Sequence, residues 1–387
     1  MNILIITFHS PYTGERVGGA ETSLRLIGEE FSKRGHEVTF FSKSHIKTWA
    51  GFKIKEIKGV KVVTFTKFKI PILNTYKAKK ISRFFQDLFI KKELKNIQIV
   101  HTYNNIGIVK YYAKLKPEFD FKLVVRMAGL KLFEDFESKP EHILTYEKYF
   151  KAIDLYNFIS EGLKELVSQK KAQFSLNIDF NPSFIKDIGI DIYKLPSKDL
   201  SLKKESSTFK IVMASRLSKY QKRQDLLIEA MVYLKRDDVQ LTLLGNGPNR
   251  RELERLVEQN NLSKKIIFKP FEKNIWNALI DYDLLVHSCD YEGLSKIIIE
   301  SMGVGLPVLA SNVTPLNTYI IDNKNGFLVD NDPRDWAEKI KIIIKKQRLL
   351  KDISENSKKF IASKYDSSIN SLVYEEIFEN LLTKKND

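Results

Sequence analysis

The amino-acid sequence predicts an α/β protein made of two doubly wound, Rossmann-like domains. Short apolar runs typical of buried parallel strands alternate with segments whose apolar residues recur at helical spacing. This alternation stops in one polar stretch near the middle of the chain and then starts again. With 387 residues, the chain also exceeds the length at which a single hydrophobic core usually stops growing.

The first half begins with a predicted strand over 2–8, a glycine-containing loop and a predicted helix over 20–34. The run NILIITF is almost continuously apolar, as expected for a strand that is buried on both faces. Apolar residues at helical spacing follow it, and Gly35 marks the end of the helix. Further strands are predicted at 37–41, 60–65, 98–101, 122–126 and 155–159.

The polar stretch over 196–208 has few large apolar side chains, so it is predicted to link two domains. The first domain is then expected over 1–195 and the second over 209–365. Strands of the second domain are predicted at 209–214, 239–244, 265–268, 284–287, 307–310 and 326–329. Helices are predicted at 224–234 and 250–260, and the pattern is helical from Pro333 to the end.

The formal net charge of +16 favours anionic partners such as phosphorylated substrates, nucleic acid or an anionic membrane. The single cysteine, Cys289, excludes an internal disulfide framework and favours a reducing compartment. No signal peptide is evident, and no apolar run reaches the length of about 18 residues that would span a membrane. We therefore expect a cytoplasmic protein.

Arg216 and Lys222 follow the predicted strand over 209–214. In doubly wound sheets, ligands bind beyond the carboxyl ends of the strands. Two cations at such an end suit a diphosphate, because Arg offers a planar fork of donors and Lys a compact charge. A solvated basic loop is the alternative, since Lys219 and Arg223 lie in the same stretch.

Two glycine turns also lie at predicted strand ends. Gly245 and Gly247 precede Pro248, which suits the first position of a helix. Glycine lets a ligand approach the backbone, and a helix N-terminus favours an anion. Gly18 and Gly19 precede the first helix without a full dinucleotide fingerprint. For both turns a purely structural role is the alternative.

The most informative stretch runs over 292–311 and contains Glu292, a glycine turn, an apolar run, Glu300 and a Gly-x-Pro. A carboxylate in such a run costs roughly 2 kcal/mol or more if it is buried without a partner. Sugar hydroxyls are suitable partners, because they donate hydrogen bonds to an ionised acceptor. Taken alone, the two carboxylates are also compatible with an acid–base pair or with metal ligands.

Further polar residues lie next to predicted strands. His101 ends the strand over 98–101, where it would face a ligand, although a lone histidine is often structural. Asp281 and Asp283 form an Asp-x-Asp of the kind that holds a metal in some transferases. Because a buried strand follows directly, Asp283 is expected to end a loop instead. Asp332, before Pro333, is expected to be a helix N-cap.

In this order and spacing, the motifs resemble those of retaining glycosyltransferases of family 4 (group 1 glycosyltransferases). The shared features are the Arg-then-Lys pair, the Gly-x-Gly-Pro turn and the glutamate pair followed by Gly-x-Pro-Val, all between about 214 and 330. Gly18–Glu21 and Ile188–Asp191 match further landmarks of the family. The resemblance implies the GT-B fold, in which two Rossmann-like domains face a central cleft, with residues 366–387 as a helix that crosses back to the first domain.

The resemblance also implies roles for individual residues. Arg216 and Lys222 would hold the donor diphosphate and stabilise it as it leaves. Glu292 would contact the donor sugar, with Gly293, Leu294, Ser295 and Lys296 near sugar hydroxyls or phosphate, and Glu300 would accept from the ribose hydroxyls. Gly19 would lie by the diphosphate, His101 would line the acceptor side, and Phe271 and Glu272 would lie near the base.

The implied reaction moves a sugar from a nucleotide-diphosphate sugar, such as a UDP- or GDP-sugar, to an acceptor hydroxyl with retention at the anomeric carbon. A front-face path without metal or other cofactor is expected, in cell-surface polysaccharide or glycolipid biosynthesis with a glycan or lipid-linked acceptor. The sequence departs from many relatives at Tyr103, Ala128 and Ser295-Lys296. These departures affect the expected contacts with the acceptor and the expected identity of the donor sugar, not the fold. A GT-B nucleotide-sugar epimerase and a non-catalytic sugar-binding subunit are the alternatives.

The segment over 67–95 is strongly basic, with nine Lys and Arg residues against Asp87 and Glu93. Its apolar residues are predicted to form one helical stripe: Ile81, Phe84, Phe85, Leu88 and Phe89. This pattern favours either a helix that packs on its own sheet or a helix at the surface of an anionic membrane. Nucleic acid is a less suitable partner, because the aromatic residues fall on the apolar stripe. If the helix binds a membrane, we expect it to lie on the inner face of the plasma membrane.

Overall fold

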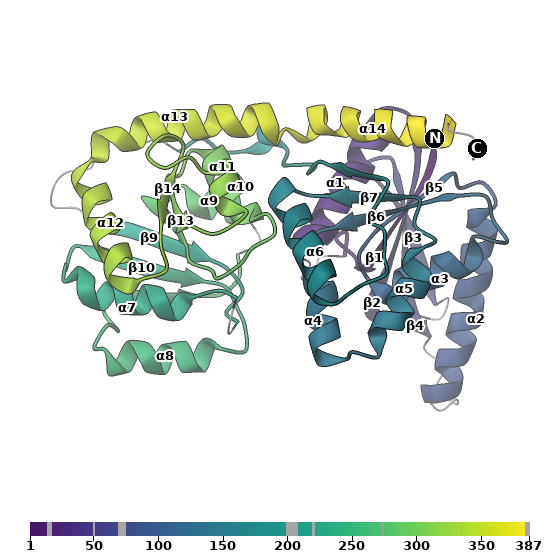
Figure 1. The fold of residues 1–387 in the computed structure, drawn as a ribbon, viewed down its shortest axis with the longest axis horizontal. Coiled ribbons are helices and arrows are strands. Elements are labelled where there is room, and N and C mark those ends of the chain that lie inside the picture. The colour runs from purple at the N-terminus through teal and green to yellow at the C-terminus, as the bar shows by residue number, and fades with distance from the viewer. Residues whose placement is uncertain are drawn as a thin grey trace. The chain divides into compact units, whose positions relative to one another are not determined.

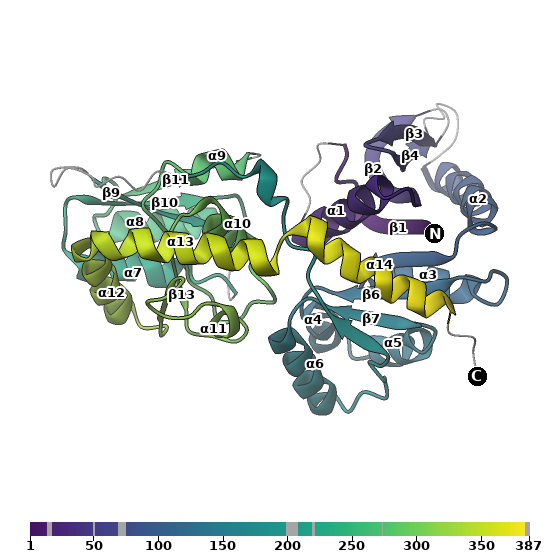
Figure 2. The same cartoon turned by 90° about the horizontal axis from the view of Figure 1, so that it is seen from above.

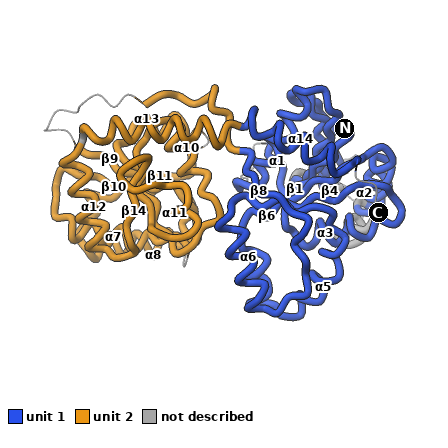
Figure 3. Tube along the Cα trace, turned by 45° about the horizontal axis from the view of Figure 1, so that its top comes forward, with its two compact units in different colours: residues 1–188, 367–387 blue, residues 189–366 orange. Residues whose placement is uncertain are grey.

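A computed structural model describes residues 1–13, 18–48, 51–68, 75–198, 208–218, 221–272 and 274–383. The chain divides into two compact units (Figures 1 and 3). Unit 1 contains residues 1–188 and 367–387, and unit 2 contains residues 189–366. Both units are α/β, with parallel strands at the centre and helices outside, as the sequence predicts.

Unit 1 is built on an eight-stranded sheet with the order β3-β4-β2-β1-β5-β6-β7-β8. All neighbouring strands are parallel except β3, which pairs antiparallel with β4. The strands are β1 (Asn2–His9), β2 (Glu37–Thr48), β3 (Phe52–Ile57), β4 (Val60–Phe68), β5 (Ile99–Tyr103), β6 (Lys122–Met127), β7 (Leu155–Phe158) and β8 (Ser183–Ile185). The sequence does not predict β3, because its outward-facing charged residues interrupt the apolar pattern.

Helices cover both faces of this sheet: α1 (Gly19–Lys33), α2 (Thr75–Leu94), α3 (Ile106–Leu115), α4 (Lys131–Ser138), α5 (His142–Phe150), α6 (Glu161–Gln173) and α14 (Ser367–Thr383). Helix α14 lies over the strands (Figure 2) and shares a core with α1 and Phe40 of β2. The next residue, Phe41, points to the opposite face, where its ring contacts Phe89 of α2. Helices α1 and α14 therefore cover one face, and α2 covers the other.

A buried polar network fixes α14 to unit 1. Arg126 of β6 is 1% exposed and forms an ion pair with Asp187. Its guanidinium also donates to Asn157 at 3.0 Å and to the Tyr374 hydroxyl of α14 at 2.8 Å. The Tyr374 hydroxyl in turn donates to the Lys186 carbonyl oxygen at 2.6 Å. Because unpaired polar groups are costly in a core, these contacts specify where α14 packs.

Unit 2 contains a parallel six-stranded sheet with the order β11-β10-β9-β12-β13-β14. Its strands are β9 (Phe209–Ala214), β10 (Val239–Leu244), β11 (Ile266–Lys269), β12 (Leu284–His287), β13 (Val308–Ser311) and β14 (Phe327–Val329). The helices are α7 (Gln224–Leu234), α8 (Arg250–Gln259), α9 (Ile275–Leu279), α10 (Lys296–Val304), α11 (Leu316–Tyr319), α12 (Pro333–Lys345) and α13 (Gln347–Lys364), with a 3-10 turn, η1 (Ile192–Lys194). The strand order reverses between β9 and β12, so ligands are expected at their carboxyl ends.

The chain passes between the units earlier than the polar stretch over 196–208 suggests. Ile188 belongs to the core of unit 1, whereas Ile190 belongs to a core of unit 2. The Ile190 amide donates to the Tyr365 carbonyl oxygen at 2.8 Å, which holds the two passing segments together. Of the predicted linker, residues 199–207 lie outside the described residues. The residues at the true boundary are apolar because each packs into the core of its own unit. A search for a polar linker therefore does not find this boundary.

Within the described residues, no helix is both long enough and apolar enough to cross a membrane.

Candidate functional site

A short backbone pairing places Lys222 beside the end of β12. The Asp290 amide donates to the Gln221 carbonyl at 3.1 Å, and the Arg223 amide donates to the Ser288 carbonyl at 3.2 Å. Lys222 lies between these two bonds, opposite Cys289. The segment that carries the predicted phosphate-binding lysine is therefore attached to the loop that carries the predicted glutamate.

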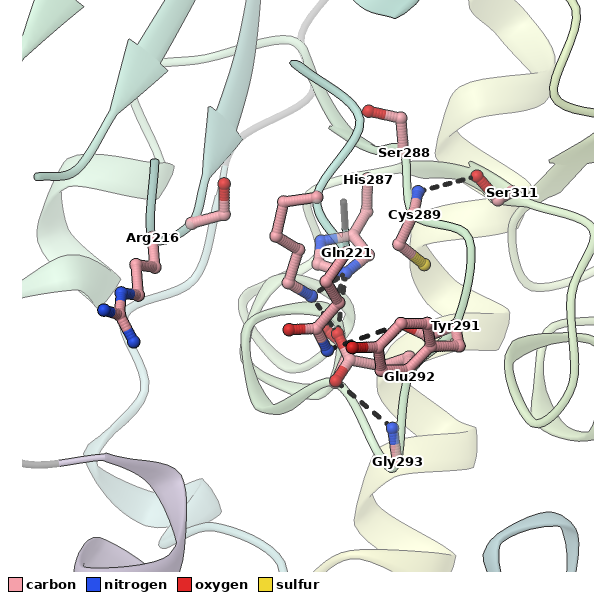
Figure 4. Close-up of polar contacts among 12 residues, drawn as sticks. Arg216, Gln221, His287, Ser288, Cys289, Tyr291, Glu292, Gly293 and Ser311 are labelled. Carbon is pink, nitrogen blue, oxygen red and sulfur yellow. Dashed lines mark hydrogen bonds and ion pairs between the residues drawn. The ribbon is translucent and has the colours of Figure 1, made fainter. Parts of the chain in front are cut away.

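Lys222, His287 and Glu292 form one cluster at the carboxyl end of β12 (Figure 4). The Lys222 ammonium forms an ion pair with the Glu292 carboxylate, and their side chains are 12% and 14% exposed. His287 Nε2 lies 3.1 Å from both Lys222 Nζ and Glu292 Oε2, and 3.3 Å from Ser295 Oγ. The Gly293 amide donates to Glu292 Oε1 at 3.2 Å. Both carboxylate oxygens of Glu292 thus have a partner.

The electrostatics of this cluster keep Glu292 ionised and His287 neutral at neutral pH. Burial raises the pKa of Glu292, but the nearby Lys222 ammonium and His287 outweigh it and hold that pKa well below its usual range. Burial and the same ammonium lower the pKa of His287 to about 4, against the opposing effect of Glu292. The cluster is therefore a buried ion pair supported by a neutral imidazole.

Arg216 differs from Lys222 because it lies exposed just after β9. In the part of the chain that the structure describes, its guanidinium has no hydrogen bond or ion pair, and Figure 4 shows it apart from Glu292. The buried Gln224 amide holds the Arg216 carbonyl at 2.9 Å and Ser215 Oγ at 3.0 Å. The backbone at this strand end is thus fixed, while the cation stays available to an anion.

The glycines of the turn after β10 meet a steric requirement. A Cβ on Gly245 would lie 1.9 Å from the Ser215 carbonyl oxygen, and one on Gly247 would lie 1.9 Å from the Leu217 carbonyl oxygen. The turn packs against the loop after β9, with the Leu217 amide donating to the Asn246 carbonyl at 3.1 Å. A structural role therefore accounts for both glycines, and their contact with a donor stays a prediction.

The start of α10 carries most of the other predicted donor contacts. Ser295 is the N-cap residue, preceded by Gly293 and Leu294, and the first helical residue is Lys296. Glu300 follows one turn later and is half-buried. Burial raises the pKa of Glu300, although Lys296 and a hydrogen bond with Trp276 of α9 oppose that shift. Glu300 therefore has a protein partner, and its contact with a ribose stays a prediction.

Three predicted donor residues are not part of this cluster. Phe271 and Glu272 follow β11 and are exposed, with 47% of the Phe271 side chain accessible to solvent. Gly19 is the exposed first residue of α1 in unit 1. The amide of its neighbour Gly18 donates to Glu21 at 3.1 Å, as in a capping box. The roles of all three toward a ligand stay predictions.

His101 does not occupy the position that the sequence suggests. It lies in the middle of β5, paired with Ile5 and Val124, because the strand continues to Tyr103. Its side chain is fully buried beneath α14, with ring centroids 5.4 Å from Phe378 and 6.3 Å from Tyr374. The prediction that His101 contacts an acceptor is therefore wrong.

Replacing His101 by leucine is expected to leave catalytic activity within about twofold and to reduce acid sensitivity. Burial, with a smaller effect of Arg126, lowers the pKa of His101 to about 3, whereas a histidine in the unfolded chain has a pKa near 6.5. The unfolded state then binds the extra proton, so stability is lost as the pH falls below about 6.5. At pH 5 this loss is about 2 kcal/mol from linkage.

Chemical denaturation at pH 7.5 and pH 5 measures the effect, which the leucine variant should show less strongly than the native chain. A His101→Leu variant with equal acid sensitivity, or with activity reduced tenfold, would contradict this assignment.

Sequence reasoning missed His287 and Gln224. Both lie next to predicted features, His287 at the last position of a predicted strand and Gln224 directly after the basic loop. The rule that ligands bind at strand ends would have selected His287. No sequence signal distinguishes Gln224 from an ordinary surface glutamine, because its role is to hold backbone atoms of a loop.

The predicted carboxylate contacts outside the cluster are structural. Asp283 accepts from the Lys210 amide at 2.7 Å, as expected for a residue that ends a loop. Asp332 accepts from the amides of Arg334 and Asp335, which confirms the predicted N-cap of α12. Among the described residues, no group of three or more His, Cys, Asp or Glu side chains has the arrangement of a metal site. Independence from metal stays a prediction.

Known proteins resemble this chain in sequence and in fold. Residues 197–360 match the family model described as glycosyl transferases group 1. The chain is 27% identical over 403 aligned residues to an uncharacterized glycosyltransferase of Methanocaldococcus jannaschii, covering 98% of this chain and 99% of the relative.

Two solved structures illustrate the likeness in fold. Sucrose-phosphate synthase from Thermosynechococcus elongatus matches with a TM-score of 0.80 and 17% identity over 98% of each chain. Anabaena HepE in complex with UDP-glucose matches with a TM-score of 0.71 and 18% identity over 98% of this chain and 100% of HepE. At such low identity these matches show the fold alone, which is GT-B with two Rossmann-like domains. In sequence, the chain is therefore similar to glycosyltransferases, and its second half is similar to those of group 1.

Proposed function

We propose that the chain is a retaining glycosyltransferase of family 4 that transfers a sugar from a nucleotide-diphosphate sugar to an acceptor hydroxyl. The observation that carries the proposal is the Lys222–Glu292–His287 cluster at the switch point of unit 2, with the exposed Arg216 at the neighbouring strand end. HepE, which has the same fold, is described in complex with UDP-glucose. A buried, ion-paired lysine beside an available arginine suits a diphosphate.

In the proposed mechanism, Arg216 and Lys222 bind the donor diphosphate and stabilise the charge that develops as it leaves. Glu292 and His287 hold the Lys222 ammonium in place, so that little reorganisation is needed during the reaction. The leaving phosphate accepts the proton of the acceptor hydroxyl on the same face of the sugar, which accounts for retention. Positioning and charge then supply most of the catalysis, and the reaction needs no metal.

The remaining site residues act on the donor in this proposal. Glu300 accepts hydrogen bonds from the ribose, the exposed Phe271 ring lies against the base, and Ser295 and Lys296 set the choice of sugar. The acceptor belongs to a cell-surface polysaccharide or a glycolipid. We place the enzyme in the cytoplasm, because its single cysteine, which is free and buried, suits a reducing compartment.

A thermal-shift screen with UDP-, GDP-, ADP- and dTDP-sugars tests the donor site. One nucleotide class is expected to raise the melting temperature, because a ligand at 100 times its Kd stabilises the folded state by about 2.7 kcal/mol. Arg216→Ala should melt at the native temperature without ligand and should lose most of the donor-induced shift, since Arg216 has no described side-chain contact to lose.

Hydrolysis of the selected donor, followed with and without candidate acceptors, then separates transfer from the alternatives. An epimerase would convert the donor without an acceptor, and a binding subunit would not convert it at all. A chain that is neither stabilised by any nucleotide sugar nor able to hydrolyse one contradicts the proposal.

A further inference from the structure

Helix α2 presents apolar side chains on two different faces. Phe89 points inward, with ring centroids 4.8 Å from Phe52, 6.0 Å from Phe41 and 6.2 Å from Phe65. Phe84, Phe85 and Leu88 are instead 61%, 49% and 49% exposed. The single apolar stripe predicted from the sequence is therefore wrong, because Phe89 anchors the helix while its neighbours face solvent.

The acidic residues of α2 are all engaged by the rest of unit 1. Asp87 accepts from the Tyr111 hydroxyl of α3 at 2.5 Å, and Glu93 pairs with Lys61 of β4 at 2.7 Å. Lys91 pairs with Glu118 at 3.0 Å. These contacts fix the rotation of α2 about its axis. They also hold its two carboxylates against unit 1, so neither carboxylate is free to neutralise the cations that face solvent.

Two of these cations lie beside the exposed apolar residues. Arg83 and Lys92 are exposed, and neither has an ion pair within the described ranges. Lys92 follows Leu88 by one turn and lies on the same side of the helix, whereas Arg83 precedes Phe84 by one residue and points about 100° away from it. Along the helix axis, the two cations therefore lie at the two ends of the apolar group. We call Arg83, Phe84, Phe85, Leu88 and Lys92 the α2 surface.

We propose that the α2 surface docks onto an anionic lipid bilayer. Aromatic and aliphatic side chains in the centre with cations at the rim suit the interface of a bilayer that carries negative headgroups. The formal net charge of +16 adds a long-range attraction to such a surface. This inference goes beyond the proposed function, because transfer of a sugar between soluble molecules would not need it.

A membrane fits the α2 surface better than a second copy of the chain or a nucleic acid. Two copies meeting through this surface would bring the cations of one copy close to those of the other, with no acidic residue on the α2 surface to pair with them. A nucleic acid would leave three adjacent apolar side chains, Phe84, Phe85 and Leu88, without the polar groups that read base edges. The bilayer satisfies both the charge and the apolar centre.

Vesicle flotation at 150 mM salt tests the proposal with two lipid compositions. The native chain is expected to float with vesicles of phosphatidylcholine containing 30% phosphatidylglycerol, and not with pure phosphatidylcholine. Raising the salt to 0.5 M should reduce binding, because the Debye length shortens. Phe84→Ser/Phe85→Ser/Leu88→Ser and Arg83→Glu/Lys92→Glu should each lower the bound-to-free ratio at least tenfold.

The matched control is Ile369→Ser/Leu372→Ser on α14, where both residues are 52% exposed. It removes two exposed apolar side chains from the other face of unit 1 and should float like the native chain. The melting temperature and the donor-induced thermal shift should be unchanged in the α2 variants. An unchanged melting temperature would show that the variants fold, and an unchanged donor-induced shift would show that donor binding does not depend on the α2 surface.

Native protein that floats with neither lipid composition would overturn the proposal, as would α2 variants that float normally. Sedimentation would identify a second copy as the occupant if the native chain were a dimer and the serine variant a monomer, and that result would also overturn it.

Discussion

Replacing Lys222 by alanine is expected to lower kcat/KM at least tenfold, which corresponds to about 1.4 kcal/mol of transition-state stabilisation. The ammonium lies at the end of β12 in contact with Glu292 and His287, so its position is fixed before a donor binds. An alanine removes the charge that would meet the leaving diphosphate. Steady-state kinetics with the donor selected by thermal shift measures the loss.

The same substitution should also destabilise unit 2, because it leaves the Glu292 carboxylate buried without its cation. Removing one partner of a buried ion pair typically costs about 3–5 kcal/mol. Lost activity could therefore reflect lost structure, and a second variant is needed to separate the two effects. Lys222→Met/Glu292→Gln replaces both charges with neutral side chains of similar length.

The double variant should recover most of the stability and none of the activity. This outcome would show that activity is lost with the charged pair and not through a loss of stability. The assignment fails if Lys222→Ala turns over at a near-native rate, or if the double variant regains activity along with stability.

Much of the fold could be predicted because buried parallel strands leave a simple pattern. The apolar runs that became β1, β9 and β10 are almost uninterrupted, so their positions are evident from residue type alone. Strand β3 could not be predicted in the same way. It is an edge strand whose charged residues alternate with apolar ones, and the turn of Lys58 and Gly59, both with positive φ, pairs it with β4.

Site residues could be predicted where a charged residue type coincides with a position after a strand. They could not be predicted where burial determines whether a side chain can reach a ligand. Lys222 and Glu292 follow strands and are cationic or anionic, so their approach could be anticipated. His101 and His287 carry the same side chain near a strand end, yet one is covered by α14 and the other contacts the ion pair. Only the packing of α14, a helix that begins more than 260 residues after His101, separates them.

Replacing Gly189 by alanine is expected to cost several kcal/mol of stability, more than most single substitutions do. Gly189 has a φ of +80° at the boundary between the units, a conformation that L residues rarely adopt. A Cβ at this position would also lie 1.9 Å from the Tyr365 carbonyl oxygen, which already accepts from the Ile190 amide. The backbone must therefore separate, and the bond between the two passing segments must break.

Gly35 provides a matched control, because its φ of +83° is almost the same while a Cβ added there would meet no atom within 4 Å. Gly35→Ala should therefore cost only the conformational strain of about 1–2 kcal/mol. The difference between the two variants in chemical denaturation isolates the collision with Tyr365. If Gly189→Ala were as stable as Gly35→Ala, the close contact with Tyr365 would not explain the glycine in the Ile188–Asp191 segment. A role of Gly189 in ligand binding or in motion at the boundary would then be the better explanation.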